Sequence, residues 1–385
     1  MTRLDEPWIA RPETVAVIKA IGSEGHPVLF VGGCVRNALL GIGAADIDLS
    51  TSARPETVMA LAETHGLKAI PTGIEHGTVT VVSGGLPFEV TTFRRDIETF
   101  GRRAVIAFTE DIGEDARRRD FTMNALYAEP DGTLVDPLGG LDDLRAGKVR
   151  FIEDATARIT EDYLRILRFF RFHAWYGDPD GGLDPEGLAA CAALAEGLQA
   201  LSKERIGAEM LKLLAAPDPA PAMAAMVATG CLLRVLPGAD PKALPVLVHL
   251  EAQLGTPPKA LRRLAALGGD NVTDNLRLSR SESRDLGTIR QAALGDAKAA
   301  ELAYRHGAEM ARDATLVRAA FLESPTPVSL ELDLAKGKDA VFPVAGNDLA
   351  GRYGGPELGR KLRELESIWI ASDFAATRAD LLKHS

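Results

Sequence analysis

The chain has 385 residues, 46% of them hydrophobic and 25% charged, with a formal net charge of −10. This composition is that of an ordinary globular protein, and the length suits more than one domain. Three scattered cysteines (Cys34, Cys191 and Cys231) argue against a disulfide framework and against structural zinc. A polar N-terminus and the lack of a long apolar run predict a cytoplasmic protein without a membrane segment. The acidic balance argues mildly against nucleic-acid binding, although residues 145–171 carry a local excess of positive charge.

The first 140 residues alternate short strands and helices. Strands are expected at 28–31 and 47–49, helices at 35–40 and 55–65, and a β-hairpin from two β-branched runs at 76–82 and 88–93. Beyond about residue 150 strand signals almost vanish and Ala, Leu, Arg and Glu dominate, which predicts a helical bundle or superhelix. The fold class is therefore α+β, a mixed β-sheet with helices followed by all-helical parts. The proline-rich stretch 217–221 is a plausible boundary.

A glycine pair, Gly32-Gly33, follows the first predicted strand, and Arg36 and then Asp46-Ile47-Asp48 come after it. Glycine lets the backbone approach a polyphosphate without interference from a Cβ atom, and arginine supplies positive charge. Asp46 and Asp48 are two residues apart, so on a strand both side chains point to the same face. Two carboxylates together with substrate phosphates suit Mg²⁺. The segment predicts a site for a nucleoside triphosphate and a metal ion.

Two further segments carry charge suited to such a site. Glu89 lies on the second strand of the predicted hairpin; it is a third carboxylate near the metal if that strand neighbours Asp48, and otherwise an exposed strand residue. The run Arg117-Arg118-Arg119 supplies guanidinium groups that pair bidentately with phosphates, or else it is a solvated run of charge. Asp136, taken alone, predicts a turn or a helix cap.

Residues 159–171 predict an amphipathic helix, because apolar residues at 159, 163, 166 and 170 recur on one helical face. Asp162, Arg165 and Arg168 step by three along another face, and Arg171 ends far round the helix from Asp162. A surface ion pair is the simplest interpretation of Asp162 and Arg165. A carboxylate beside a guanidinium also reads a base: it accepts from the exocyclic amine of cytosine or adenine while arginine donates to the adjacent ring nitrogen. Uracil and guanine present the reverse order and would be rejected.

Taken together, five segments in order resemble those of the bacterial class II CCA-adding tRNA nucleotidyltransferase and poly(A) polymerase family. They are Gly32-Gly33-x-Val35-Arg36 with Asp46 and Asp48, Arg118-Arg119-Asp120-Phe121-Thr122-x-Asn124-Ala125, Asp136-Pro137-x-Gly139-Gly140, Glu161-Asp162-x-x-Arg165-x-Leu167-Arg168-x-x-Arg171-Phe172, and Ser202-Lys203-Glu204-Arg205-Ile206. The resemblance is strong over residues 28–210 and thins beyond them.

The resemblance implies a division into parts and roles for single residues. The parts are a nucleotidyltransferase head or palm at 1–145, a helical neck with the base-reading helix at 146–216, a helical body at 217–310 and a helical, tRNA-binding tail at 311–385. Asp46 and Asp48 would hold Mg²⁺, with Glu89 as a third candidate catalytic carboxylate. The remaining implied residues bind the nucleotide: Gly33, Arg36 and Arg119 at the triphosphate or ribose, Asp162 and Arg165 at the base, and Arg168 and Arg171 completing the pocket.

The implied reaction is attack of the tRNA 3′-hydroxyl on the α-phosphate of CTP or ATP, which releases pyrophosphate and adds C, C and A without a nucleic-acid template. Two metal ions would activate the attacking oxygen and neutralise the leaving one. The expected partners are tRNA, CTP and ATP, with no membrane and no obligate protein partner. A poly(A) polymerase, an enzyme adding only CC or only A, and a catalytically silent RNA-binding protein are the alternatives. Residues 94–104 resemble the flexible loop of full CCA-adding enzymes and favour complete addition.

Three positions qualify the resemblance. Asn37 stands where the family usually has Asp, and we expect it to keep a supporting hydrogen bond. Glu75 stands where a basic residue is commoner, which weakens a local phosphate or loop contact. Ser202 is either part of the family pattern or simply the N-cap of a helix.

Overall fold

The computed structural model describes residues 2–43, 46–100 and 103–385. The chain divides into two compact units, Met1–Pro237 and Gly238–Ser385. The proline-rich stretch 217–221 is not the boundary between them, because helix α10 (Ala220–Ala228) packs against helix α7 (Leu164–Tyr176) within the first unit. The finer division into head, neck, body and tail stays a prediction.

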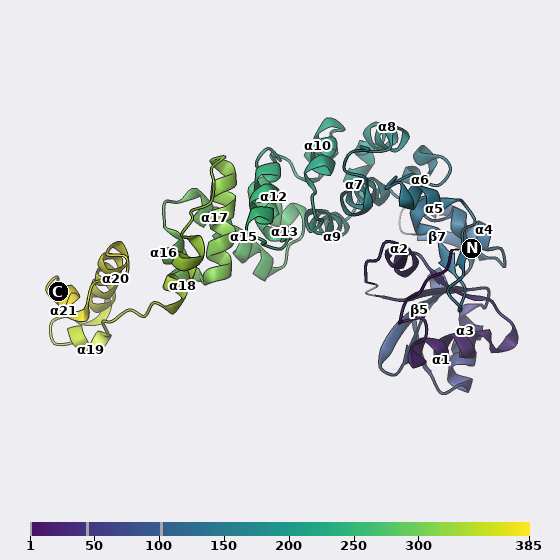
Figure 1. Ribbon diagram of the computed structural model, residues 1–385, viewed down its shortest axis with the longest axis horizontal. Coiled ribbons are helices and arrows are strands. Elements are labelled where there is room, and N and C mark those ends of the chain that lie inside the picture. Colours follow the sequence, from purple (N-terminus) through teal and green to yellow (C-terminus); the bar gives the residue numbers. More distant parts are fainter. Residues whose placement is uncertain (1, 44–45, 101–102) are drawn as a thin grey trace. The chain divides into compact units, whose positions relative to one another are not determined.

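The first unit contains the mixed sheet that the sequence predicts. In spatial order the strands are β3 (Lys68–Gly73), β4 (Thr78–Ser83), β5 (Leu86–Thr92), β2 (Asp48–Thr51), β1 (Val28–Val31), β8 (Tyr127–Ala128) and β9 (Leu134–Val135). Strands β2 and β5 run parallel, and the other neighbouring pairs are antiparallel. Helices α1 (Pro12–Ile21) and α3 (Pro55–Thr64) lie side by side, and both pack against β4 (Figure 1).

The predicted hairpin is confirmed as β4 and β5. Buried and half-buried residues alternate along β4, with Val79 and Val81 fully buried, so one face of this strand contributes to the core. The two-residue turn is formed by Gly84 and Gly85, whose φ angles of 58° and 84° suit a tight hairpin turn. This hairpin places β5 beside β2, where the predicted carboxylates lie.

The segment that resembles the family's flexible loop contains two strands. Strands β6 (Arg94–Phe100) and β7 (Arg103–Phe108) pair antiparallel as a separate two-stranded sheet, with a register shift between Asp96 and Glu98. The sequence of this segment contains several β-branched residues, which favour extended backbone. Residues 101–102 of this segment lie outside the described residues.

The helix predicted over 159–171 is interrupted. Helix α6 (Ala155–Glu161) ends before Asp162, whose backbone is extended at φ −153° and ψ 106°, and α7 begins two residues later at Leu164. The Asp162 carboxylate accepts a hydrogen bond from the Leu164 backbone N–H at 3.1 Å, as a capping side chain does. The prediction of a single helical face through Asp162, Arg165 and Arg168 is therefore wrong.

The other helices of the first unit connect and flank these elements. They are α2 (Gly33–Leu39), α4 (Ile112–Arg117), α5 (Gly140–Arg145), α8 (Pro185–Ala193), α9 (Lys203–Leu214) and α11 (Cys231–Val235), with short 3₁₀ turns at Gly22–Glu24, Ile74–His76, Thr122–Asn124 and Ala195–Ala200. Ser202 caps α9, since its side chain accepts from the Arg205 backbone N–H. Asp136 accepts from the Gly140 and Leu141 N–H groups, which confirms its predicted role as a cap.

The second unit is helical, as expected. Its helices are α12 (Ala243–Gln253), α13 (Ala260–Leu267), α14 (Val272–Asn275), α15 (Arg280–Leu294), α16 (Ala299–His306), α17 (Ala308–Phe321), α18 (Leu330–Asp339), α19 (Gly346–Leu349), α20 (Gly355–Ala371) and α21 (Arg378–Leu382). A buried ion-pair cluster joins three of them: Arg262 contacts Glu251 and Asp313 at 2.7 and 2.9 Å, and Arg263 contacts Glu251 at 2.7 Å. No helix among the described residues is long and apolar enough to cross a membrane.

Candidate active site

A cavity of about 480 Å³ in the first unit gathers most of the predicted site residues. Its lining comprises Gly32, Gly33, Arg36, Asp48, Arg118, Arg119, Asp120, Asn124, Asp162, Leu164, Arg165, Arg168, Phe172 and Arg205. These residues come from the start of α2, strand β2, the segment after α4, the break between α6 and α7, and helices α7 and α9. The predicted residues Asp46, Glu89 and Arg171 are not in the lining.

The glycine pair forms the turn between β1 and α2. Gly32 has φ 70°, and a Cβ atom there would lie 3.5 Å from Nη1 of Arg119, so this position combines a left-handed conformation with close packing. Gly33 opens α2, and a Cβ atom there would lie 3.8 Å from Nη2 of Arg36. The turn therefore brings backbone close to two guanidinium groups.

Arg36 is buried, and its partners are uncharged. Its Nη1 donates to the Asn124 side-chain oxygen at 2.5 Å and its Nη2 donates to the Tyr176 hydroxyl at 2.9 Å. The guanidinium also lies over the rings of Phe172 and Tyr176, at 5.2 and 4.1 Å from their centroids. Asn37 accepts from both Nε and Nη2 of Arg36, at 3.2 and 2.9 Å, which confirms its expected supporting hydrogen bond.

Carboxylates gather at the start of β2. Asp48 is the register partner of Glu89 across the parallel β2–β5 pair, so the neighbouring strands needed for the Glu89 prediction are present. Burial, the charge of Glu89 and, more weakly, that of Asp46 raise the pKa of Asp48 to about 6, while Arg119 acts in the opposite direction. Asp46 lies in a bend before the strand and is exposed, so it does not alternate with Asp48 along regular β-structure.

These carboxylates fit a metal that takes its remaining ligands from elsewhere. Among the described residues, no group of three or more His, Cys, Asp or Glu side chains is arranged to hold a metal ion by itself. Mg²⁺ is commonly bound by one or two carboxylates, with water and substrate phosphates completing its shell. The raised pKa of Asp48 reflects partly desolvated negative charge, which a cation would relieve.

Arg118 and Arg119 are oriented by a buried carboxylate, Asp115 of α4. Asp115 Oδ1 accepts from Arg118 Nε at 2.8 Å, and Oδ2 accepts from Arg119 Nη2 at 3.1 Å and from the Tyr127 hydroxyl at 2.7 Å. Burial raises the pKa of Asp115, but Arg119 and Arg118 outweigh it and hold the pKa at about 2. The run Arg117–Arg119 is thus not simply solvated: Arg117 is exposed, whereas Arg118 and Arg119 line the cavity.

Asp162 and Arg165 line the same cavity, but they do not pair with each other. Asp162 Oδ2 accepts from Arg205 Nη2 at 2.6 Å. Arg165 Nη1 donates to Glu161 at 2.5 Å and to the Arg158 carbonyl at 2.9 Å, and its Nη2 donates to the Arg118 carbonyl at 3.1 Å. The simple surface ion pair is therefore wrong, because each member has a different partner that fixes its orientation.

Arg168 and Arg171 differ in where they lie. Arg168 Nε donates to Asp120 at 2.6 Å within the cavity lining, and the pKa of Asp120 falls to about 2 because Arg168, Asn124 and Arg165 outweigh the effect of burial. Arg171 instead donates to Glu209 of α9 at 2.6 Å, outside the lining. This position fits helix geometry, because residues spaced three apart turn progressively around the axis and Arg171 is the last of the row.

Several lining residues were not singled out as site residues from the sequence. Arg118, Asp120, Asn124 and Arg205 stand in the matching segments, so the signal was present. Phe172 also stands in a matching segment, directly after Arg171. Asp115 does have a signal, since it precedes Arg118 and Arg119 by three and four residues, the spacing of neighbours on a helix.

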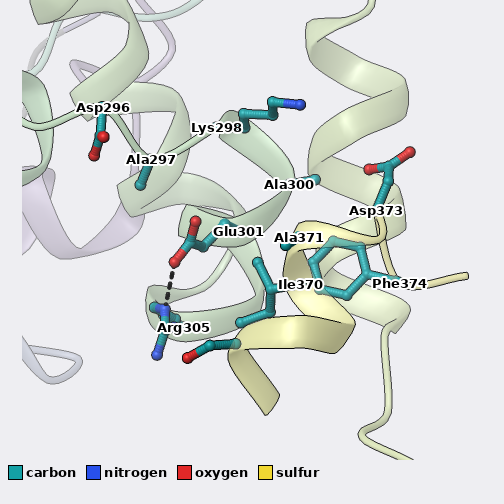
Figure 2. A pocket seen from close by; sticks show the side chains of 11 residues that line it. Asp296, Ala297, Lys298, Ala300, Glu301, Arg305, Ile370, Ala371, Asp373 and Phe374 are labelled. Carbon is teal, nitrogen blue, oxygen red and sulfur yellow. Dashed lines mark hydrogen bonds and ion pairs between the residues drawn. The ribbon is translucent and has the colours of Figure 1, made fainter. Parts of the chain in front are cut away.

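A second cavity, of about 260 Å³, lies in the second unit between α16 and α20 (Figure 2). Figure 2 shows Glu301 reaching Arg305, an ion pair of 2.9 Å, with Ile370 and Phe374 nearby. None of the predicted site residues lines this cavity.

Comparisons with known proteins agree with the resemblance. Residues 28–150 match the family described as Poly A polymerase head domain, and residues 182–242 match Probable RNA and SrmB- binding site of polymerase A. The mitochondrial CCA tRNA nucleotidyltransferase 1 of Homo sapiens is 34% identical over 386 residues, covering 94% of this chain and 87% of the human protein. The CCA-adding enzyme of Levilactobacillus brevis is 32% identical over 382 residues, covering 94% and 93%.

Solved structures give the same result. The Bacillus stearothermophilus CCA-adding enzyme in complex with CTP superposes with a TM-score of 0.72 at 29% identity, covering 94% of each chain. The Thermotoga maritima CCA-adding enzyme complexed with tRNA shares the fold, with a TM-score of 0.69 at 20% identity over 99% of this chain and 95% of that one. From the fold, the cavity and these relatives, the chain belongs to the family of CCA tRNA nucleotidyltransferases.

Proposed function

We propose that this chain adds C, C and A to the 3′ end of tRNA, with CTP and ATP as substrates bound in the cavity of the first unit. The observation that carries the proposal is the presence, in one cavity, of a carboxylate at the start of β2, a glycine turn, six arginines including Arg165, and the Asp162 side chain. Each is a part that template-free nucleotide transfer needs: a metal ligand, a phosphate cradle and a base reader.

The triphosphate would lie against the glycine turn, Arg36 and Arg119. Gly33 leaves the start of α2 open to phosphate oxygens, and arginine pairs with phosphates through charge-assisted hydrogen bonds. Among the described residues, the hydrogen-bond partners of Arg36 are neutral, so its charge is available to an anion. Arg168 would complete the pocket, and Arg171 would act on it indirectly through Glu209 and the packing of α7.

Asp46 and Asp48 would hold Mg²⁺, with Glu89 as the third carboxylate of the catalytic set. The strand pairing of Asp48 with Glu89 and the raised pKa of Asp48 support this assignment. Mg²⁺, when bound, would activate the tRNA 3′-hydroxyl and neutralise charge on the triphosphate. The protein's part is to hold these carboxylates beside the arginines that bind the same phosphates.

Asp162 and Arg165 would select the base. The bonds that Asp162 makes to Arg205 and to the Leu164 N–H leave lone pairs on both oxygens, which suits the exocyclic amine of cytosine or adenine. Arg165 Nε–H makes no bond to the described residues and suits the adjacent ring nitrogen. In this proposal the helices after residue 145 serve as neck, body and tail and hold tRNA mainly by shape and backbone contacts.

The experiment supplies purified protein and Mg²⁺ with tRNA that lacks its 3′ end, and with CTP, ATP or both, and resolves products at single-nucleotide resolution. Growth by C, C and A with both nucleotides, and by CC with CTP alone, is the expected result. A long A ladder would assign poly(A) polymerase activity, and a stop after CC with both nucleotides would assign a split activity. No extension would leave an RNA-binding protein without catalysis.

A further inference from the structure

We propose that Asp115 is a positioning residue for nucleotide transfer: it holds Arg118 and Arg119 against the cavity so that they bind the polyphosphate rather than the base. This inference rests on the proposed function of the same cavity. Asp115 itself does not line the cavity and is fully buried, so it acts only through the side chains that it holds.

The hydrogen bonds of Asp115 account for both arginines. Oδ1 accepts from Nε and Nη2 of Arg118, each at 2.8 Å, and from the Arg94 backbone N–H at 3.3 Å. Oδ2 accepts from Arg119 Nη2 and from the Tyr127 hydroxyl, while Arg119 Nε donates to the same hydroxyl at 3.1 Å. All of these hydrogen-bonding groups donate to Asp115, so an ionised carboxylate with two acceptor oxygens satisfies them together.

The cluster also fixes where the Arg119 guanidinium and the Arg118 backbone lie. The Arg119 guanidinium packs beside the Gly32 turn, with Nη1 3.5 Å from the position of a Cβ atom on Gly32. The Arg118 backbone carbonyl accepts from Arg165 Nη2, so the same segment also braces the base-reading arginine. Because Arg94 begins β6, Asp115 additionally ties the base of the β6–β7 hairpin to this cluster.

Two substitutions separate position from charge. Asp115→Asn keeps the shape but turns one oxygen into an amino group, which would face a donor and displace a guanidinium or the tyrosine hydroxyl. Asp115→Glu keeps the charge but moves the carboxylate by one methylene. If Asp115 acts only as a negative charge, Asp115→Asn strengthens CTP binding and Asp115→Glu leaves it unchanged. If Asp115 positions the arginines, both variants weaken CTP binding.

The test measures dissociation constants of CTP and CMP by calorimetry, using the full chain without tRNA. We expect the ratio of the CMP constant to the CTP constant to fall at least tenfold in both variants, because displaced arginines no longer bind the β- and γ-phosphates, which CMP lacks. Asp313→Asn is the matched control: Asp313 is equally buried and accepts from Arg262 and Lys259, but it lies in the second unit and should leave the ratio unchanged.

Three results would overturn the inference. One is an equal loss for CTP and CMP, which a merely structural role predicts; another is tighter CTP binding by Asp115→Asn. The third is that both variants keep the preference of the wild-type protein for CTP over CMP. That result would contradict the role of Asp115 but not the proposed function. A wild-type protein with no preference for CTP would remove the triphosphate site itself, and the inference with it. Thermal unfolding of each variant identifies misfolded protein, and Asp115→Glu supplies the result if Asp115→Asn does not fold.

Discussion

Replacement of Asp162 by alanine tests base selection directly. The variant removes the acceptor for the exocyclic amine of cytosine or adenine, and it also removes the negative charge that would repel the carbonyl oxygen of uracil. A hydrogen bond to a charged group contributes about 1.5–3 kcal/mol. The preference for CTP over UTP, expressed as a ratio of kcat/KM values, should therefore fall roughly ten- to 100-fold.

The structure supplies a matched control for this variant. Asp154 is also an aspartate at a helix start, where its side chain accepts from the Ala157 N–H at 2.6 Å, but it is exposed and lies outside the cavity. Loss of a cap costs about 1 kcal/mol of stability in either variant, so Asp154→Ala reports that shared cost. Single-turnover extension of tRNA with each of the four nucleotides gives the ratios. If Asp162→Ala keeps the wild-type preference for CTP within about twofold, base reading by this carboxylate is refuted.

Three further outcomes are expected. Glu251→Gln should lower the free energy of unfolding of the second unit by about 3–5 kcal/mol in urea denaturation, because the buried guanidinium groups of Arg262 and Arg263 lose their shared carboxylate. An unchanged denaturation midpoint would contradict this. Gly140→Ala places a Cβ atom 2.1 Å from the Thr122 carbonyl oxygen and should lower the melting temperature, whereas Gly43→Ala, in open space, should not. Because Asp48 with a pKa of about 6 must lose its proton to bind metal, the apparent Kd for Mg²⁺ should rise about tenfold per pH unit below 6; a flat profile in metal titrations would refute this.

The sheet and the glycine turn could be predicted because their signals are local. Alternating β-branched residues and a Gly-Gly turn specify the β4–β5 hairpin, and four consecutive apolar residues specify the buried β1 strand. The sequence placed Glu89 near the metal only if its strand neighboured Asp48, as it does. The strand order itself could not be predicted, because it depends on contacts between segments far apart in the chain.

The break at Asp162 could not be predicted from periodicity, because apolar spacing continues across it from Ile159 to Phe170. At the break Asp162 accepts both from the nearby Leu164 N–H and from Arg205, which lies 43 positions further along the chain. Arg171 illustrates the same limit: its sequence position matches the family, but its partner Glu209 is decided by the packing of α7 on α9. Which arginine faces a ligand is a property of the assembled helices.

The pairing of the cavity arginines has a consequence for selectivity among polyanions. Arg118 and Arg119 share Asp115, while Arg165, Arg168 and Arg205 have Glu161, Asp120 and Asp162. The cavity thus carries its own counter-ions, and an arbitrary stretch of RNA backbone gains little by entering it. In the proposed function a ligand binds the donor and acceptor groups that these contacts leave available, with phosphates and a base held at fixed separation. A free nucleoside triphosphate presents both kinds of group, and we expect the cavity to favour it over RNA backbone.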